Sequence, residues 1–475
     1  MTELRRLAHA VILGAFSGPV VPAWLAPAYA DGLAGICLYG NNIPPSGDIA
    51  GLARRVRAVD PTAVLALDEE GGDVTRLHSR TGSPYLGNAA LGVCDDIELT
   101  HAVAAGIGAE LAQAGVWLDL APSADINSNP HNPVIGTRSF GADPALVARH
   151  TAAFVAGLAS QGIAASVKHF PGHGDTSTDS HLGLPRVTVT TDVLRARELV
   201  PFAVAAATVM TSHVLLDAFD DQQPATLSHP VLTGLLRDEL GFDGVIVTDA
   251  LDMAGASAIH GVGGAAVMSL AAGADLLCLG PEESAEPHAI HEVVDAVCRA
   301  VGSGDLSLDR LTEAATSVAA LRDTWSALSP RPGGSGVIAD ARLASVRAAA
   351  GLVAAAPRFD GPAKVIRIDT GTNLAVGDTA WGVLDLGGGT VDLIAADVSS
   401  TPVHPGEVAV VVRRATAVPE VWAWIERQLS TNPLTTLIEL GWPDPALTAH
   451  DRVVRTYGSA AVLTDALAAA MRGDR

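Results

Sequence analysis

The sequence contains only two lysines, Lys168 and Lys364, among its 30 basic residues, and these are outnumbered by 52 acidic residues. The formal net charge of −22 argues against nucleic acids, anionic membranes and polyphosphates as partners. Because arginine is used almost everywhere else, a lysine at position 168 suggests that its compact ammonium group is needed there.

Cysteine is also scarce: the four cysteines are distant in sequence and form no CxxC pair. This pattern favours free thiols in a reducing compartment, so we expect the protein to be cytoplasmic. No run of about 18 apolar residues occurs, and we therefore predict no membrane span. Residues 1–30 resemble a secretory signal in having Arg5 and Arg6 before an apolar run, which leaves secretion as the less favoured alternative. Glycine and proline interrupt that run, and residues 32–42 continue it as a helix–strand unit.

Up to about residue 330, short apolar runs alternate with longer helical patterns rich in alanine and leucine. Near-continuous apolar strands separated by helices are typical of a parallel sheet that is covered on both faces. The number of units predicts a TIM-like (β/α)₈ barrel. The predicted strands are AVILGAF (10–16), GICLYG (35–40), AVLALD (63–68), VWLDLAP (116–122), ASVKHF (165–170), TVMTSH (208–213), GVIVTD (244–249) and DLLCLG (275–280).

The stretch SPRPGGSG (329–336) has the composition of a linker, and it predicts a domain boundary. We divide the chain into a catalytic barrel (1–330), a linker with a connecting helix (331–358) and a smaller C-terminal α/β sandwich domain (359–475). The strands expected in this last domain are 363–369, 379–386, 391–397, 407–414 and 434–441. The glycine cluster in GDTAWGVLDLGGGT (377–390) lacks the spacing of a phosphate-binding loop, and we interpret it as a turn.

Ionisable side chains and histidines stand at the C-terminal ends of several predicted strands. These residues are Asp68, Lys168, His169, His213 and Asp249. In a barrel, this is the rim where catalytic groups gather. The alternative is that polar residues begin wherever strands end.

The stretch KHFPGHGDTSTDSHLGLP (168–185) concentrates lysine, histidine and aspartate between prolines and glycines that exclude a helix. Without a helix, His169 and His173 do not form a zinc-binding face, so we predict no metal. A purely structural loop accounts for the serines and threonines but poorly for the remaining residues. In extended backbone, Asp179 and His181 project to the same side, and the carboxylate can then orient the imidazole for proton transfer. A glycine-rich loop would let this pair close over a ligand.

Asp249 ends a predicted strand, where it could act as a covalent nucleophile or stabilise a cationic transition state. Asp252 is the alternative, although it falls at an expected helix start. Asp68, Arg76 and Arg138 are suited to binding sugar hydroxyl groups.

Two further sets of polar residues receive no direct role. We assign Glu69 and Glu70 to a solvated turn, and His213 to a structural or supporting position.

Together these residues resemble glycoside hydrolase family 3, in its NagZ-like β-N-acetylglucosaminidase branch. The resemblance covers about residues 14–280 and rests on LDEEGGDVTRL, VIGTRSFG, KHFPGHGDTSTDSHLGLP and LRDELGFDGVIVTDALDM, in that order. It implies a retaining exo-glycosidase that needs no cofactor and removes terminal β-linked GlcNAc from peptidoglycan fragments, chitooligosaccharides or other GlcNAc glycosides.

The resemblance also implies roles for individual residues. Asp249 matches the nucleophile, and His181 with Asp179 matches the acid/base dyad. The sugar-binding positions correspond to Asp68, Arg76, Arg138, Lys168 and His169.

Three alternatives remain open at this stage. A histidine in place of a carboxylate does not repel an anionic acceptor, so the enzyme could transfer GlcNAc to phosphate instead of water. A β-glucosidase or β-xylosidase would lack the dyad. A non-catalytic GlcNAc-binding regulator would not need Asp249, Asp179 and His181 intact. The expected partner is a small saccharide, and the sequence indicates no oligomeric state.

Overall fold

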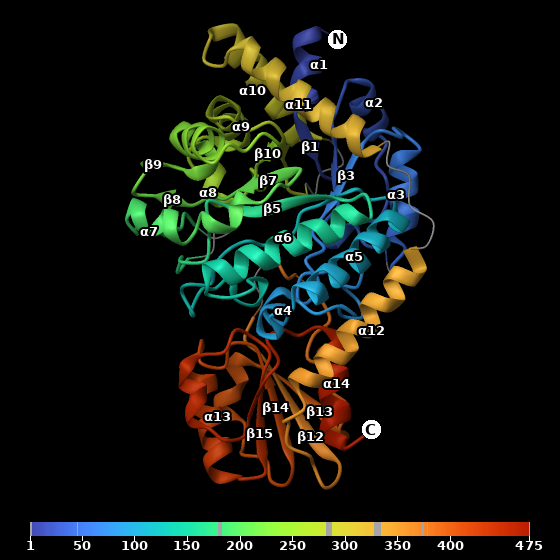
Figure 1. Ribbon diagram of the computed structural model, residues 1–475, viewed down its shortest axis with the longest axis vertical. Coiled ribbons are helices and arrows are strands. Elements are labelled where there is room, and N and C mark those ends of the chain that lie inside the picture. Colours follow the sequence, from blue (N-terminus) through green and yellow to red (C-terminus); the bar gives the residue numbers. More distant parts are fainter. Residues whose placement is uncertain are drawn as a thin grey trace.

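The computed structural model describes residues 2–44, 46–178, 183–281, 287–326, 334–371, 375–377 and 379–474. In Figure 1, a barrel in the upper half stands above a smaller C-terminal α/β unit.

The barrel is a sheet of eight parallel strands in the spatial order β10-β7-β5-β4-β3-β2-β1-β11. A parallel bridge between Val247 and Leu276 joins its two edges, which closes the sheet. All the predicted strands are present, and the predicted barrel is confirmed. The strands are β1 (Ile12–Gly14), β2 (Gly35–Cys37), β3 (Val64–Leu67), β4 (Leu118–Asp119), β5 (Ala164–Phe170), β7 (Thr208–Thr211), β10 (Val245–Val247) and β11 (Leu277–Cys278).

Helices surround the barrel and bury its outward-facing apolar side chains in one large core. Local signals set their limits: the Asp96 side chain caps the start of α5, and Gly115 ends it in the left-handed conformation. The helices are α1 (Glu3–His9), α2 (Leu25–Ala30), α3 (Ile49–Arg57), α4 (Asn88–Cys94), α5 (Ile97–Ala114), α6 (Pro144–Ser160), α7 (Thr191–Ala196), a π-helix (Pro230–Glu239), α8 (Ala254–Ser257), α9 (Gly261–Ala272), α10 (His288–Ser303) and α11 (Leu308–Ser326). A small sheet of β6 (Arg186–Val187), β8 (Leu215–Leu216) and β9 (Asp220–Pro224) lies beside the barrel.

The N-terminal segment forms α1, β1 and α2, and β1 pairs with both β2 and β11 inside the barrel. The expected helix–strand unit is therefore confirmed. Within the described ranges, none of the helices has both the length and the apolar character required to cross a membrane. All four cysteines carry free thiols; Cys37 and Cys278 are buried, whereas Cys94 and Cys298 are half-buried.

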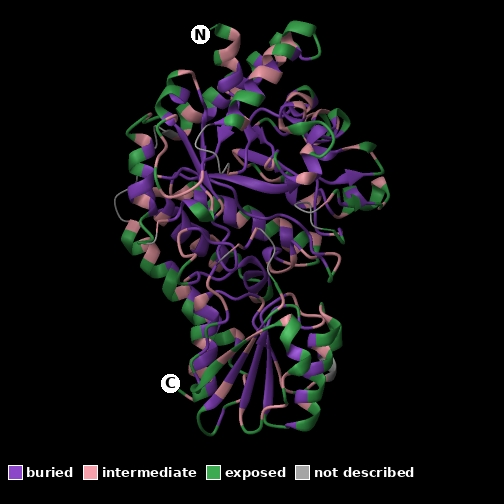
Figure 2. Ribbon diagram, turned by 180° about the vertical axis from the view of Figure 1, so that it is seen from behind, coloured by how far each residue is buried: buried purple, intermediate pink, exposed green. Residues whose placement is uncertain are grey.

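The C-terminal unit is a parallel sheet in the order β13-β12-β14-β15-β16. Helix α13 (Pro419–Thr431) packs on one face, and α14 (Ala461–Arg472) packs on the other. Figure 2 shows the buried central strands between partly exposed helices. The predicted α/β sandwich is confirmed. Its strands are β12 (Ala363–Asp369), β13 (Gly387–Ile394), β14 (Val408–Val412), β15 (Thr435–Glu439) and β16 (Val453–Arg455).

In this unit one predicted strand is absent, the interpretation of the glycine cluster as a turn was wrong, and one strand was missed. Residues 379–386 form no strand, and the glycine cluster is not a turn but the start of the edge strand β13. A Cβ atom on Gly388 would lie 2.4 Å from the carbonyl oxygen of Ala363 on β12, so only glycine allows the strands to approach there. The short strand β16 was not predicted, because its three residues give too brief a pattern.

Helix α12 (Gly334–Leu352) connects the two parts: it packs along α5 of the barrel and also contacts α14. The last three residues of the predicted linker form its first turn, whereas 329–333 lie outside the described residues. The domain limits drawn from the sequence remain a prediction.

Polar contacts also fix the C-terminal unit against the barrel mouth. The Asp73 carboxylate accepts hydrogen bonds from the backbone N–H of Ser459 (2.5 Å) and its hydroxyl (2.7 Å). Arg76 donates to the carbonyl oxygen of Ala375 at 2.9 Å.

The packing of α4 predicts the effect of one added methyl group. A Cβ on Gly92 would lie 1.7 Å from the carbonyl oxygen of Phe140, and a backbone oxygen cannot rotate away. We expect Gly92→Ala to destabilise the protein by about 1–3 kcal/mol or more. Gly351→Ala, in α12 with no atom within 4 Å, is the control; it should be neutral or stabilising by up to about 1 kcal/mol. Thermal unfolding of both variants is the measurement, and equal melting temperatures would contradict this packing.

Candidate active site

A pocket with a volume of about 730 Å³ opens at the C-terminal ends of the barrel strands. All six sequence-predicted site residues within the described ranges line it. They are Asp68, Arg76, Arg138, Lys168, His169 and Asp249. The C-terminal unit supplies part of the wall through residues 375–377 and Thr379.

Lys168 forms the centre of a buried ion cluster. It projects from β5, and its Nζ lies 2.6 Å from Asp68 Oδ1 and 2.7 Å from Glu70 Oε1. Burial alone would lower the pKa of Lys168, but the two carboxylates raise it above its ordinary value. The residue is 1% exposed, so the ammonium group is held by carboxylates in place of water.

Arg138, the last residue of the 3₁₀ turn η2 (Gly136–Arg138), completes the cluster. Its Nε and Nη2 donate to the two oxygens of Glu70 at 3.0 and 2.8 Å, a bidentate arrangement. Burial would raise the pKa of Glu70, yet Arg138 and Lys168 hold it well below the ordinary value. Burial likewise opposes ionisation of Asp68, whose pKa is lowered by Lys168 and Arg76.

The prediction that Glu69 and Glu70 form a solvated turn was wrong, because both side chains are buried. Glu70 carries the ion cluster described above. Glu69 accepts hydrogen bonds from the backbone N–H groups of Arg76 and Leu77, at 2.8 and 2.9 Å, and thereby shapes the turn. Two successive carboxylates after a strand have the composition of an exposed turn, and only their partners reveal that they are buried.

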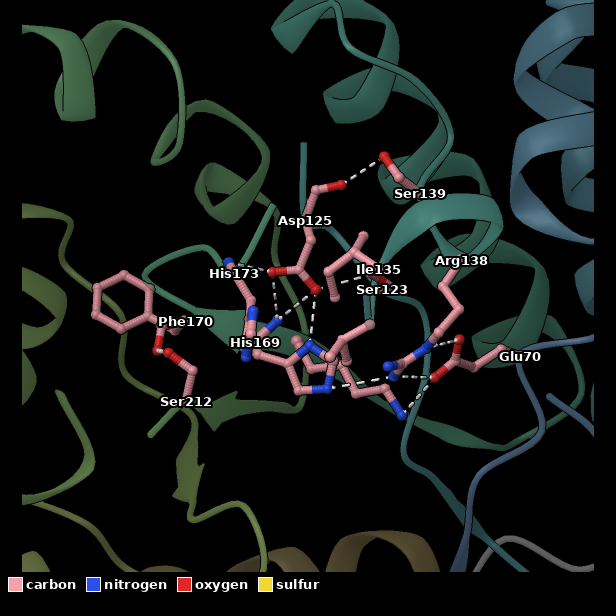
Figure 3. A network of polar contacts seen from close by, with 12 residues as sticks. Glu70, Ser123, Asp125, Ile135, Arg138, Ser139, His169, Phe170, His173 and Ser212 are labelled. Atoms are coloured by element: carbon pink, nitrogen blue, oxygen red, sulfur yellow. Dashed lines mark hydrogen bonds and ion pairs between the residues drawn. The ribbon is translucent and has the colours of Figure 1, made fainter. Parts of the chain in front are cut away.

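A second chain of contacts runs from Arg138 through His169 to Asp125 (Figure 3). Arg138 Nη2 lies 3.3 Å from His169 Nε2, and His169 Nδ1 lies 2.7 Å from Asp125 Oδ2. A guanidinium only donates, so Nε2 accepts and Nδ1 carries the proton toward Asp125. Burial would raise the pKa of Asp125, but His169 and His173 lower it to about 2.

The first half of the 168–185 stretch is anchored against the barrel. The backbone N–H of His173 donates to Asp125 at 2.7 Å, and Asn132 donates to the carbonyl oxygens of His173 and Thr176. Burial lowers the pKa of His173 to about 4. A Cβ on Gly174 would lie 1.7 Å from the carbonyl oxygen of Ile126, so glycine is required there. Two histidines of this stretch, His169 and His173, are therefore buried and not exposed on a loop.

Asp179 and His181, the predicted acid/base dyad, lie outside the described residues, so their assignment stays a prediction. In the described part of the chain, no group of three or more histidine, cysteine or acidic side chains is arranged to hold a metal ion.

Asp249 lies two residues beyond β10, on the pocket wall. Its Oδ1 accepts the backbone N–H of Ala250 at 2.8 Å. His213 is buried, and its Nε2 donates to the carbonyl oxygen of Ala250 at 3.0 Å, so it supports the segment that carries Asp249, in agreement with the expected structural position. Asp252 also lines the pocket, and its carboxylate accepts the N–H of Gly280 at 2.7 Å.

Sequence reasoning missed three contributors to this site: Glu70, Asp125 and the C-terminal wall. Asp125 lies six residues beyond β4, in the loop that follows this strand, and an acidic residue in such a loop is a candidate for the barrel rim. No local signal marks the wall at 375–377, because the contact joins segments about 300 residues apart in the chain.

Several known proteins are similar to this chain. Residues 28–321 match the family described as Glycosyl hydrolase family 3 N terminal domain. The chain is 33% identical over 318 residues to "Beta-hexosaminidase A" of Pseudoalteromonas piscicida, covering 61% of this chain and 53% of that protein. It is 36% identical over 248 residues to "Beta-hexosaminidase" of Pseudomonas aeruginosa (strain LESB58), covering 51% of this chain and 73% of that protein.

A solved structure is similar over almost the whole chain. It is the glycoside hydrolase family 3 beta-N-acetylglucosaminidase from Paenibacillus sp. str. FPU-7, with a TM-score of 0.84 and 30% identity, covering 100% of this chain and 97% of that one. The family match spans the barrel and its pocket, and the structural similarity extends through the C-terminal unit. The chain therefore belongs to glycosyl hydrolase family 3.

Proposed function

We propose that this protein is a retaining exo-β-N-acetylglucosaminidase that hydrolyses terminal β-linked GlcNAc. The observation that carries the proposal is the pocket at the barrel mouth, where Asp249 faces the same space as the buried ion cluster of Asp68, Glu70, Lys168 and Arg138. Similarity to a beta-N-acetylglucosaminidase over the full chain and to proteins named beta-hexosaminidase supports the choice of sugar.

In the proposed first step, a carboxylate oxygen of Asp249 bonds to the anomeric carbon while the bond to the leaving oxygen breaks. His181, oriented by Asp179, gives its proton to that oxygen. In the second step, water attacks the anomeric carbon, its proton passes to His181, and the bond to Asp249 breaks to release GlcNAc. The two displacements together retain the β configuration.

The charged cluster is suited to binding the sugar ring through its hydroxyl groups. The Asp68 side chain is 16% exposed, whereas that of Lys168 is 2% exposed, so Asp68 presents an acceptor to the ligand while Lys168 lies behind it. Arg76, Arg138 and His169 also line the pocket and serve as further polar contacts.

The wall at 375–377 and Thr379 stands over one side of the pocket, and we propose that it favours attack on a chain end. Peptidoglycan fragments, chitooligosaccharides and other GlcNAc glycosides all offer such an end. A cytoplasmic location is part of the proposal and is supported by the four free thiols.

A panel of aryl β-glycosides that differ only at the sugar 2-position tests the proposed activity. We expect turnover of the N-acetylamino sugar and little turnover of the 2-hydroxy and 2-deoxy analogues, with GlcNAc as the product in both phosphate and a non-coordinating buffer. Release of GlcNAc-1-phosphate, at a rate that depends on the phosphate concentration, would show that the reaction is phosphorolysis and not hydrolysis. Binding of GlcNAc without turnover of any glycoside would indicate a regulator.

The nucleophile assignment predicts different effects at two neighbouring carboxylates. Asp249→Ala should abolish turnover while retaining GlcNAc binding, because the covalent intermediate cannot form. Asp252→Asn is the matched control and should retain activity within about tenfold, since Asn can still accept the N–H of Gly280. Turnover rates and calorimetric binding of GlcNAc are the measurements. Activity of Asp249→Ala within about tenfold of wild type would refute the assignment.

The two lysines provide a test of the ion cluster. Lys168→Met removes the ammonium group that offsets the cost of burying the Asp68 and Glu70 carboxylates. Removal of one partner from a buried ion pair destabilises a protein by about 3–5 kcal/mol. We expect a marked fall in melting temperature and loss of GlcNAc binding. Lys364→Met, on the partly exposed face of β12, should change stability by no more than about 0.5 kcal/mol. Equal behaviour of the two variants would contradict the role given to Lys168.

A further inference from the structure

A second, smaller pocket lies where the C-terminal unit meets the barrel. Its volume is about 70 Å³, several times the roughly 10–15 Å³ that one water molecule requires. Val134 and Val376 line both this pocket and the larger one, so the two cavities share a wall. On the barrel side, most of the lining comes from residues 132–137, which immediately precede Arg138.

The C-terminal side of this pocket is built from strand ends. Gly371 follows β12, Arg413 and Arg414 follow β14, and Gly441 with Trp442 follow β15. After β12 the chain places β13 on one side of it and β14 on the other, so the strand order reverses at β12. In open parallel sheets, ligands bind beyond the carboxyl ends of the strands at such a reversal.

Arg413 contributes a buried guanidinium group to the lining of this pocket. The residue is 8% exposed, and its guanidinium carbon lies 4.0 Å from the centre of the Trp381 ring. Its Nη2 is buried and has no hydrogen-bond partner among the described residues. Burial lowers the pKa of Arg413 and outweighs the opposing effects of Asp73 and Asp369. A buried guanidinium with an unused donor is costly unless an anion binds it.

The backbone next to Arg413 is fixed by the buried Glu439. Arg414 has a positive φ of 56°, and the buried Glu439 carboxylate accepts its backbone N–H at 2.7 Å and that of Gly441 at 2.6 Å. Glu439 thus fixes the ends of β14 and β15 on which the pocket depends. The Arg414 side chain is exposed beside the pocket and donates weakly to the carbonyl oxygen of Pro133 at 3.4 Å.

One acidic side chain, Asp73, also lines the pocket, but its carboxylate is already engaged. Oδ1 accepts both donors of Ser459, and Oδ2 accepts the hydroxyl of Thr137 at 2.7 Å. The lining therefore contains two arginines and one carboxylate that is already hydrogen-bonded, which leaves a formal excess of positive charge.

We propose that this pocket is a binding site for a small oxyanion, a carboxylate or a phosphate, which pairs with Arg413. The anion is either a free ion or an acidic group on the leaving part of a glycoside that extends past the shared wall. The free-ion source is independent of the proposed glycosidase activity, whereas the substrate source rests on it. Occupancy would brace the segment that leads to Arg138.

Calorimetric titration with inorganic sulfate and with inorganic phosphate tests the free-ion source. GlcNAc is present to fill the larger pocket, and its own binding is measured separately. We expect Arg413→Gln to weaken oxyanion binding about tenfold or more, the effect of losing one charge-assisted hydrogen bond. Arg427→Gln, on the exposed face of α13, is the control and should bind as wild type does. Since no turnover is involved, this result does not depend on the glycosidase proposal.

Turnover of paired GlcNAc glycosides tests the other source. If the anion belongs to the substrate, Arg413→Gln should lower kcat/KM about tenfold for a GlcNAc glycoside whose leaving group carries a carboxylate. The kcat/KM for a GlcNAc glycoside with a neutral leaving group should be unchanged. Failure of both arms would overturn the proposal.

Thermal unfolding in oxyanion-free buffer separates binding from a structural role. Removing an unpaired buried charge should leave the melting temperature of Arg413→Gln equal to or above that of wild type. A markedly lower melting temperature would show that Arg413 supports the fold, and would also overturn the proposal.

Discussion

The site depends on one buried carboxylate, Glu70, held between Lys168 and Arg138. Burying any of these charges alone would cost several kcal/mol, so each is tolerable only in the presence of the others. The three residues come from the end of β3, from β5 and from the turn η2. Their pairing therefore requires that separate strand ends converge, and it places a fixed group of paired charges at the base of the barrel mouth.

The contacts of His169 extend this group toward the stretch expected to carry the acid/base dyad. Arg138 and Asp125 hold opposite sides of the imidazole, and Asp125 also holds the backbone of His173. A single carboxylate thus links the ion cluster to the loop that begins at the end of β5. We infer that displacement of either element would be transmitted to the other, because both depend on the same pair of oxygens.

The C-terminal unit takes part in the architecture of the site and is not simply attached to the barrel. Asp73 and Arg76 lie in the same turn as Glu70, and both bond to the C-terminal unit, through Ser459 and Ala375. The contacts that fix this turn consequently place residues 375–377 beside the pocket. The same junction creates the smaller pocket at Arg413, since the wall between the two cavities is shared.

The sequence by itself determined the barrel and the positions of Asp68, Lys168, His169 and Asp249 at its rim, because apolar periodicity and strand ends are local patterns. Arg76 and Arg138 were also candidates from their loop positions, the family resemblance agreed with them, and both line the pocket. Only the tertiary structure decided that Glu70 is buried, that Asp125 orients His169, and that glycines 387–389 form an edge strand. The physical reason is that the same residue type, a carboxylate or a glycine, occurs both in solvated turns and in buried, paired positions. Its state follows from partners that are brought to it by segments remote in the chain.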